Sequence, residues 1–226
     1  MVVEQYGVRR PMSPHFPACS PSETNVSILA VLGKTREVSA PPELPDVVHR
    51  AFDVGRRAGY VSFCRNETGR LLAALAATRS GTMAEFGTGC GVGTAWLRSG
   101  VRGEQARILT AELDPKLARA AAEIFTDDPL VDVLTADWST LRDKGPYSLL
   151  FLDSGQPSEV GVDAMSELVE PGGIVVLDDF VPCEQWPPTT GGRVDTLREA
   201  WLTDERFTAV EVMVAPDSSA VVATRR

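Results

Sequence analysis

The sequence predicts an α/β fold in which a mostly parallel, doubly wound sheet carries helices on both faces and ends in an antiparallel hairpin. Three observations support this prediction. Short apolar segments of strand length alternate with segments of helical periodicity over most of the chain. The segment 147–152 is almost unbroken in its apolar character, as expected for a central parallel strand covered on both faces. The last two strand-like segments, 207–214 and 219–224, are separated only by a short turn.

The order of the elements follows from these periodicities and from turn and cap residues. The predicted strands are a short run ending at Glu85, then 107–113, 131–136, 147–152, 174–177, 207–214 and 219–224. The predicted helices are 46–59, 67–78 with Asn66 as N-cap, 94–99, one beginning at Asp114-Pro115, 158–169 and 194–202. Residues 180–192 are rich in proline, glycine and aromatic residues, which favours a shaped surface loop.

Composition and charge limit the classes of protein to consider. With 226 residues, 43% of them hydrophobic, we expect one domain over residues 41–226 after a flexible N-terminal arm over residues 1–40. The net charge of −9 argues against nucleic acid as a partner, because no basic stripe is present to displace counterions. The four cysteines form no metal or redox motif, and no apolar run approaches the roughly 18 residues of a membrane span. We therefore expect a cytoplasmic protein with reduced thiols.

The most informative stretch is Met83 to Thr94, which reads Met-Ala-Glu-Phe-Gly-Thr-Gly-Cys-Gly-Val-Gly-Thr. A strand here turns sharply into a helix through glycines, which tolerate positive φ and let a ligand approach the backbone closely. The dinucleotide spacing G-x-G-x-x-G does not fit, and no lysine follows to complete a phosphate-binding loop. The spacing E-x-G-x-G-x-G-x-G resembles motif I of the class I S-adenosylmethionine-dependent methyltransferases.

A second segment, Leu-Val-Glu-Pro-Gly-Gly-Ile-Val-Val-Leu-Asp-Asp at 168–179, is similar to a late motif of the same superfamily. The resemblance covers residues 60–226 and implies a Rossmann-like sheet finished by a C-terminal hairpin. It also implies S-adenosylmethionine as the cofactor. The cofactor-binding residues that it implies are Glu85, Phe86, Gly87, Thr88, Gly89, Gly91, Thr94, Glu112, Leu113, Asp137, Trp138 and Asp153.

Three of these residues have specific expected roles. Glu112 ends the second strand, at the distance from the glycines at which a βαβ unit places a carboxylate beside a ribose; the alternative is a solvated strand end. The resemblance implies that Asp137 accepts from the adenine amino group and that Trp138 packs on the adenine ring. Helix N-capping by Asp137 and core packing of Trp138 are the alternatives.

Three aspartates follow strands at the predicted carboxyl edge of the sheet. Asp153 follows 147–152, and Asp178 and Asp179 follow 174–177. This placement is similar to the catechol and caffeoyl-coenzyme-A O-methyltransferases, in which an aspartate and an Asp-Asn pair bind magnesium. The resemblance implies Asp153 as the catalytic residue and all three aspartates as ligands of Mg²⁺ or another divalent cation. Gln156 stands where those enzymes have a lysine base, so the base is not identified, and Asp153 could instead lie beside the methyl donor without a metal.

The leading hypothesis is an S-adenosylmethionine-dependent methyltransferase that modifies a hydroxyl of a small, phenolic metabolite, with metal assistance. A metal-independent N-methyltransferase of the same fold and a non-catalytic S-adenosylmethionine-binding regulatory subunit are the alternatives. The expected partner is the small-molecule acceptor, without nucleic acid or membrane, and the resemblance also allows a homodimer.

Overall fold

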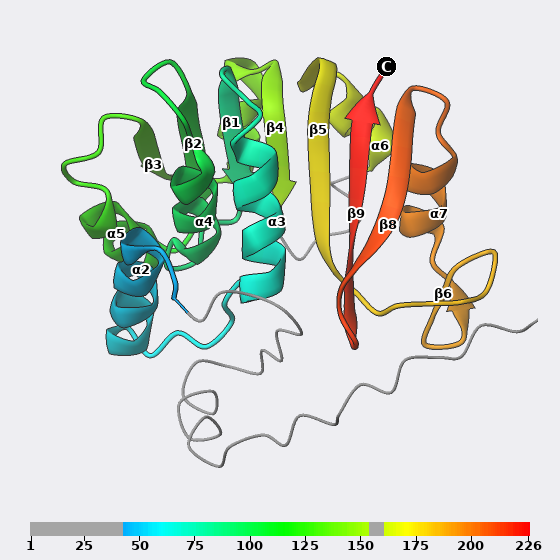
Figure 1. Ribbon diagram of the computed structural model, residues 1–226, viewed down its shortest axis with the longest axis horizontal. Helices are drawn as coiled ribbons and strands as arrows, with labels where there is room; N and C mark the ends of the chain where they lie inside the picture. The colour runs from blue at the N-terminus through cyan, green and yellow to red at the C-terminus, as the bar shows by residue number, and fades with distance from the viewer. Residues whose placement is uncertain (1–42, 154–160) are drawn as a thin grey trace, which may run out of the picture.

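The computed structural model describes residues 43–153 and 161–226, and its centre is a seven-stranded sheet (Figure 1). Its strands are β1 (Thr82–Phe86), β2 (Arg107–Glu112), β3 (Val131–Thr135), β4 (Tyr147–Leu152), β5 (Val169–Phe180), β8 (Phe207–Ala215) and β9 (Ser218–Arg225). The strand order across the sheet is β3-β2-β1-β4-β5-β9-β8. The first five strands in this order are parallel, and β9 pairs antiparallel with both β5 and β8. The predicted α/β fold with a Rossmann-like sheet and a final antiparallel hairpin is confirmed.

The strand order reverses at β1, which pairs with β2 on one side and with β4 on the other. Open α/β sheets bind ligands outside the carboxyl ends of the strands at such a switch point. Here that point lies between Phe86, the last residue of β1, and Leu152, the last residue of β4. The topology therefore places the glycine stretch and Asp153 side by side.

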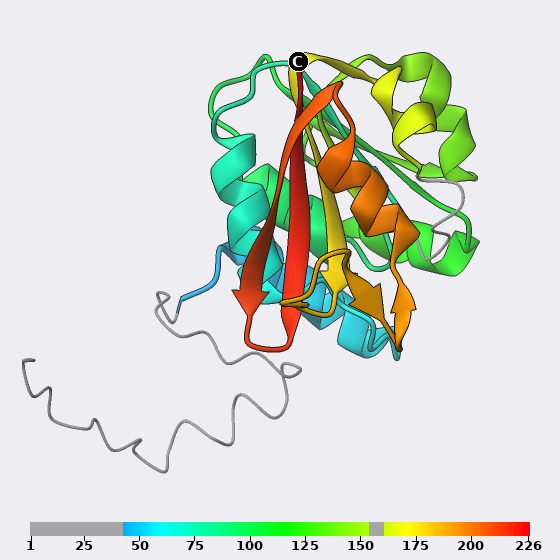
Figure 2. The ribbon, with the colours of Figure 1, turned by 90° about the vertical axis from the view of Figure 1, so that its right-hand side faces the viewer.

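Helices cover both faces of the sheet (Figure 2). One apolar core contains residues of α2 (Asp46–Arg57), α3 (Asn66–Ala76), α4 (Val92–Gly100) and α5 (Pro115–Ile124). The other contains residues of the 3-10 helix η1 (Trp138–Lys144), α6 (Val162–Ser166) and α7 (Thr196–Thr203). The largest side chain in the first core is Trp96 and in the second Trp201, and both are buried completely or nearly so. This two-layer covering explains why β4 is buried at all six positions.

Several predicted boundaries differ from the structure. Asn66 is the first residue of α3 and is buried, so the prediction of Asn66 as N-cap is wrong, and Arg65 holds that position. The Glu170–Gly173 stretch, expected to precede a strand, instead interrupts β5 by shifting its register against β4. The expected loop after β5 contains a small two-stranded sheet, β6 (Thr189–Thr190) and β7 (Arg193–Val194). The first part of the helix predicted at 158–169, the residue Gln156 and the arm at 1–40 lie outside the described residues.

Candidate cofactor site

The turn from β1 into α4 is built from glycines with left-handed backbone angles. Gly87, Gly89 and Gly91 have φ values of 92°, 52° and 84°. The Gly87 N–H donates to the Ala111 carbonyl of β2 at 3.2 Å, and the Gly91 N–H donates to the Thr88 carbonyl at 2.8 Å. The turn is thereby fixed at the carboxyl edge of β1, where Gly87 is partly exposed and Gly89 and Gly91 are buried.

Glu85 lies beneath this turn and has no exposed surface. Its Oε2 atom accepts hydrogen bonds from the hydroxyls of Thr94, in the first turn of α4, and of Thr110, in β2. Within the part of the chain that the structure describes, its Oε1 atom has no hydrogen-bond partner; it faces Gly93, where a β-carbon would lie only 2.1 Å away. Burial raises the pKa of Glu85 to about 8. The predicted cofactor residues Glu85 and Thr94 thus bond to each other inside the protein, where they hold the turn against the sheet.

Glu112 joins the turn to the end of β2. Its Oε2 atom accepts from the Gly89 N–H at 2.8 Å, and its Oε1 atom accepts from the Asp114 N–H at 2.9 Å. Each carboxylate oxygen has two lone pairs, so both oxygens keep an acceptor site for a further donor. The side chain is only partly buried. Glu112 is therefore oriented by the backbone and open to a diol, and the alternative of a merely solvated strand end does not describe it.

The predicted adenine-binding residues lie around the ends of β2 and β3. Leu113, next to Glu112, is 71% exposed. Asp137 accepts from the Ser139 N–H at 2.9 Å and caps η1, so the capping alternative is realised. Trp138 is half-buried and stacks on Phe86 with ring centroids 4.8 Å apart. The Phe86 side chain is buried in the core, so only its backbone faces the turn.

Two further residues of the motif make internal contacts. Thr88 is almost fully buried and shares a hydrogen bond with Thr110, which connects the turn to β2 a second time. The Asp153 N–H donates to the Phe86 carbonyl at 3.1 Å and so extends the pairing of β1 with β4 by one residue.

Acidic groups meet at the carboxyl edge of β4 and β5. Burial raises the pKa of Asp153 well above its ordinary value, and the neighbouring carboxylates of Glu85, Asp178, Asp179 and Glu112 raise it further. Asp178 accepts from the Thr68 hydroxyl at 3.0 Å, and burial raises the pKa of Asp178 to about 6. An edge of this kind favours a cationic ligand.

The three predicted metal ligands do not form a donor set in the structure. Asp179 is exposed and has a φ of 65°, whereas Asp178 is partly buried and bonded to Thr68. Within residues 43–153 and 161–226, no three His, Cys, Asp or Glu side chains are arranged to hold a metal ion. The residues as placed do not fit a metal, so the metal assignment stays a prediction from the resemblance and no step below passes through a metal.

Sequence reasoning missed two residues of this site. Thr68, fully buried in α3, reaches Asp178 across 110 positions of sequence, and Tyr60, in the connection between α2 and α3, lies over Gly89. Neither belongs to a motif, and both contacts depend on how α3 packs beside the sheet. Only the position of Tyr60 directly after the helix-ending Gly59 was a local signal that the chain turns there.

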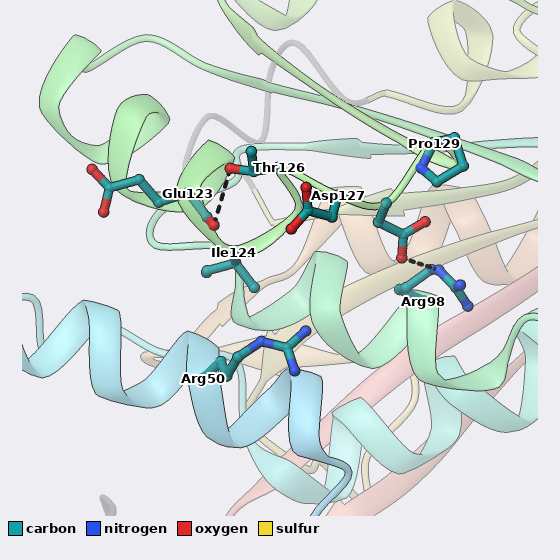
Figure 3. A pocket seen from close by; sticks show the side chains of 8 residues that line it. Arg50, Arg98, Glu123, Ile124, Thr126, Asp127 and Pro129 are labelled. Carbon is teal, nitrogen blue, oxygen red and sulfur yellow. Dashed lines mark hydrogen bonds and ion pairs between the residues drawn. The ribbon is translucent and has the colours of Figure 1, made fainter.

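A pocket of about 460 Å³ lies elsewhere, between α2, the end of α4 and the segment after α5 (Figure 3). Its lining is charged and of mixed sign; it comprises Arg50, Arg98, Glu123, Ile124, Thr126, Asp127, Asp128 and Pro129. The Arg98 guanidinium is already paired with Asp128 at 2.5 Å. No predicted site residue lines this pocket, so it is separate from the glycine turn.

A glycine turn at the switch point, a carboxylate at the end of β2 and a sheet closed by an antiparallel strand are the features that the resemblance to class I methyltransferases implies. Residues 84–180 match the family model described as "Methyltransferase domain". This range contains the glycine turn, Glu112, Asp137 and the acidic edge at Asp153 and Asp178. The resemblance inferred from the sequence is thus confirmed.

Individual relatives agree with this class. A Mycolicibacterium vanbaalenii protein named "Putative O-methyltransferase" is 31% identical over 137 residues, which are 57% of this chain and 58% of that protein. The match therefore spans somewhat more than half of the relative's length.

Two solved structures share the fold. O-methyltransferase TomG of Streptomyces achromogenes, solved with S-adenosylmethionine, aligns over 81% of this chain and 92% of its own at 18% identity and a TM-score of 0.64. An O-methyltransferase of Bacillus cereus, solved with S-adenosylhomocysteine, aligns over 82% of this chain and 93% of its own. Its sequence identity is also 18% and its TM-score is also 0.64. At such identities the likeness concerns the fold. Among the described helices, none combines the length and apolar character needed to cross a bilayer.

Proposed function

We propose that this protein is an S-adenosylmethionine-dependent methyltransferase that transfers a methyl group to a hydroxyl of a small metabolite. The observation that carries the proposal is the bond between Glu112 and the Gly89 N–H at the switch point of the sheet. A carboxylate held there, with spare acceptor capacity, suits the two hydroxyls of a ribose. The match of residues 84–180 and the cofactors bound by the two structural relatives support the same cofactor.

The roles of the residues follow from their positions. Glu112 binds the ribose, and the exposed Leu113 and the partly exposed Trp138 offer apolar surface to the adenine ring. Asp137, whose cap bond uses one carboxylate oxygen, can accept from the adenine amino group with the other. The acidic edge around Asp153 faces the sulfonium end, where negative groups favour a cation. When bound, the cofactor supplies an electrophilic methyl carbon for an in-line displacement.

The acceptor must then lie about 3 Å from the methyl carbon with a lone pair free and water excluded. The segment that follows Asp178 and Asp179 carries two exposed apolar residues, Val181 and Trp186, at 60% and 63% exposure. Such side chains suit the apolar body of a phenol. We therefore propose a phenolic hydroxyl as the acceptor, in keeping with the resemblance to the catechol-type enzymes.

Calorimetric titration with S-adenosylhomocysteine tests the cofactor assignment. We expect the wild-type protein to bind and Glu112→Gln to bind about tenfold or more weakly, because one charged acceptor is lost. Glu104→Gln, an exposed position between α4 and β2, is the matched control and should bind as the wild type does. Absence of binding by the wild-type protein would contradict the proposal.

A methyl-transfer screen with phenols and amines, each with and without a chelator, tests the acceptor and the metal. Turnover of phenols that chelator abolishes supports metal assistance through Asp153, Asp178 and Asp179. Turnover of phenols that is insensitive to chelator supports a metal-free hydroxyl transfer. Turnover of amines alone would replace the proposed acceptor class by that of an N-methyltransferase, and cofactor binding without any turnover would favour a regulatory subunit.

A further inference from the structure

Tyr60 lies directly on the glycine turn. It belongs to the short connection between α2 and α3, which passes below the carboxyl ends of the strands in Figure 1. A β-carbon at Gly89 would lie 2.6 Å from the Tyr60 hydroxyl oxygen and 2.9 Å from the ring carbon Cζ. Gly89 is also the residue whose N–H donates to Glu112. The phenol therefore lies against the glycine that holds the proposed ribose carboxylate.

The Tyr60 ring is held in this position by other aromatic rings. It meets Phe63 edge to face with centroids 5.5 Å apart, and Phe63 in turn meets Phe52 of α2 at 5.2 Å. Edge-to-face pairs of this geometry stabilise one ring orientation. The hydroxyl is thus positioned by packing before any ligand arrives.

Negative charges act on the Tyr60 hydroxyl. Burial, and then the charges of Asp153 and Glu112 and the Cys90 thiol, raise the pKa of Tyr60 to about 12. A side-chain hydrogen bond with Ser62 acts in the opposite direction, which means that the phenol oxygen accepts it. The hydroxyl therefore keeps its proton at neutral pH and can donate it to a ligand.

We infer that Tyr60 is a cofactor-binding residue whose hydroxyl donates a hydrogen bond to the ring oxygen of the ribose of bound S-adenosylmethionine. The two carboxylates whose charges act on Tyr60 indicate this position, because Glu112 lies at the proposed ribose end and Asp153 at the proposed sulfonium end. The sulfonium and the carbon atoms next to it accept no hydrogen bond, so the ribose ring oxygen is the acceptor between these two ends. This inference rests on the proposed function, since it requires the cofactor to occupy the glycine turn.

Substitution of the hydroxyl alone tests the inference. Tyr60→Phe keeps the ring and its aromatic contacts, so the ligand-free protein should unfold at the same temperature as the wild type. Titration with S-adenosylhomocysteine should show binding weakened about five- to tenfold, the size of one hydrogen bond. Tyr147→Phe is the matched control, because the Tyr147 hydroxyl is buried at the opposite end of β4, donates to the Leu141 carbonyl and should leave the affinity unchanged.

The possible outcomes separate this inference from the proposed function. If the wild-type protein binds S-adenosylhomocysteine and Tyr60→Phe binds equally well, the role of the hydroxyl is overturned while the cofactor assignment stands. If Tyr60→Leu weakens binding and Tyr60→Phe does not, only the ring contributes and the inference is likewise overturned. If the wild-type protein does not bind, the proposed function itself fails.

Discussion

Glu85 has a fully buried carboxyl group directly beneath the glycine turn. The sequence predicts Glu85 as a cofactor-binding residue. The structure adds that the carboxyl group bonds to Thr94 and Thr110 and that one of its oxygens has no partner among the described residues. Ionisation of such a group without a nearby cation is costly. The protonation state of Glu85 therefore links the stability of the turn to pH.

Glu85→Gln should change how stability depends on pH. The folded protein holds the Glu85 proton up to about pH 8, whereas the unfolded chain loses it near the ordinary pKa of 4.5. Since the unfolded state binds fewer protons between these values, the free energy of unfolding falls as pH rises through this window and levels off above it. In urea unfolding at pH 5, 7 and 9, the free energy of unfolding of the wild type should fall, relative to that of the glutamine variant, by on the order of 4 kcal/mol in total. Parallel pH profiles for the two proteins would contradict this assignment.

At the scale of elements, Arg198 of α7 connects the segment after β5 to the sheet. Its side chain has no exposed surface, and its guanidinium donates to the Val181 carbonyl at 2.9 Å, to Glu211 of β8 at 3.0 Å and to Asp195 at 3.0 Å. A further bond reaches Thr190 of the small sheet at 3.0 Å. The Arg198 guanidinium thus fixes the segment after β5, which carries Val181 and Trp186, the apolar residues proposed to contact the acceptor.

Arg198→Met should destabilise the protein by about 3–5 kcal/mol, because it leaves the carboxylates of Asp195 and Glu211 without their buried partner. Urea unfolding measures the loss, and hydrogen exchange should show faster exchange over residues 180–195 than over β1 or β4. Arg56→Met is the matched control, since Arg56 forms an exposed pair with Asp53 on α2 and should cost no more than about 1 kcal/mol. Equal losses in the two variants would show that the network does not hold this segment.

The elements that were predicted well from the sequence are those defined by local pattern. The β4 boundaries agree at both ends, and the β8–β9 hairpin agrees within one residue, because uninterrupted apolar runs and a turn signal define them. The pair β6–β7 was not predicted, since two-residue strands carry no periodicity. Glu112 was predicted from its distance to the glycines, whereas Thr68, Tyr60 and Arg198 act through contacts that only the packed fold creates.

At the scale of the whole molecule, the buried members of the two apolar cores within the described residues run from Val48 to Ala223. Each face of the sheet is covered by helices of the described part of the chain. The domain proposed for residues 41–226 therefore contains the packing that a stable unit needs.

Deletion of residues 1–40 should leave this domain folded. We expect cooperative unfolding with a midpoint within a few degrees of the full chain, because the described residues by themselves supply two buried cores. Calorimetry of both proteins checks the midpoint, and titration with S-adenosylhomocysteine checks whether the cofactor still binds. A truncated protein that unfolds without cooperativity would show that the domain begins earlier.

The place of β9 has a consequence for the order in which the chain can fold. β8 is synthesised before β9, yet β9 lies between β8 and β5 and supplies the pairing for both. A chain in which β9 has not yet docked therefore leaves β5 and β8 each with an unpaired edge that awaits the same partner. A chain cut short between residues 215 and 218 would keep that edge of β5 open, and open strand edges pair with strands of other chains.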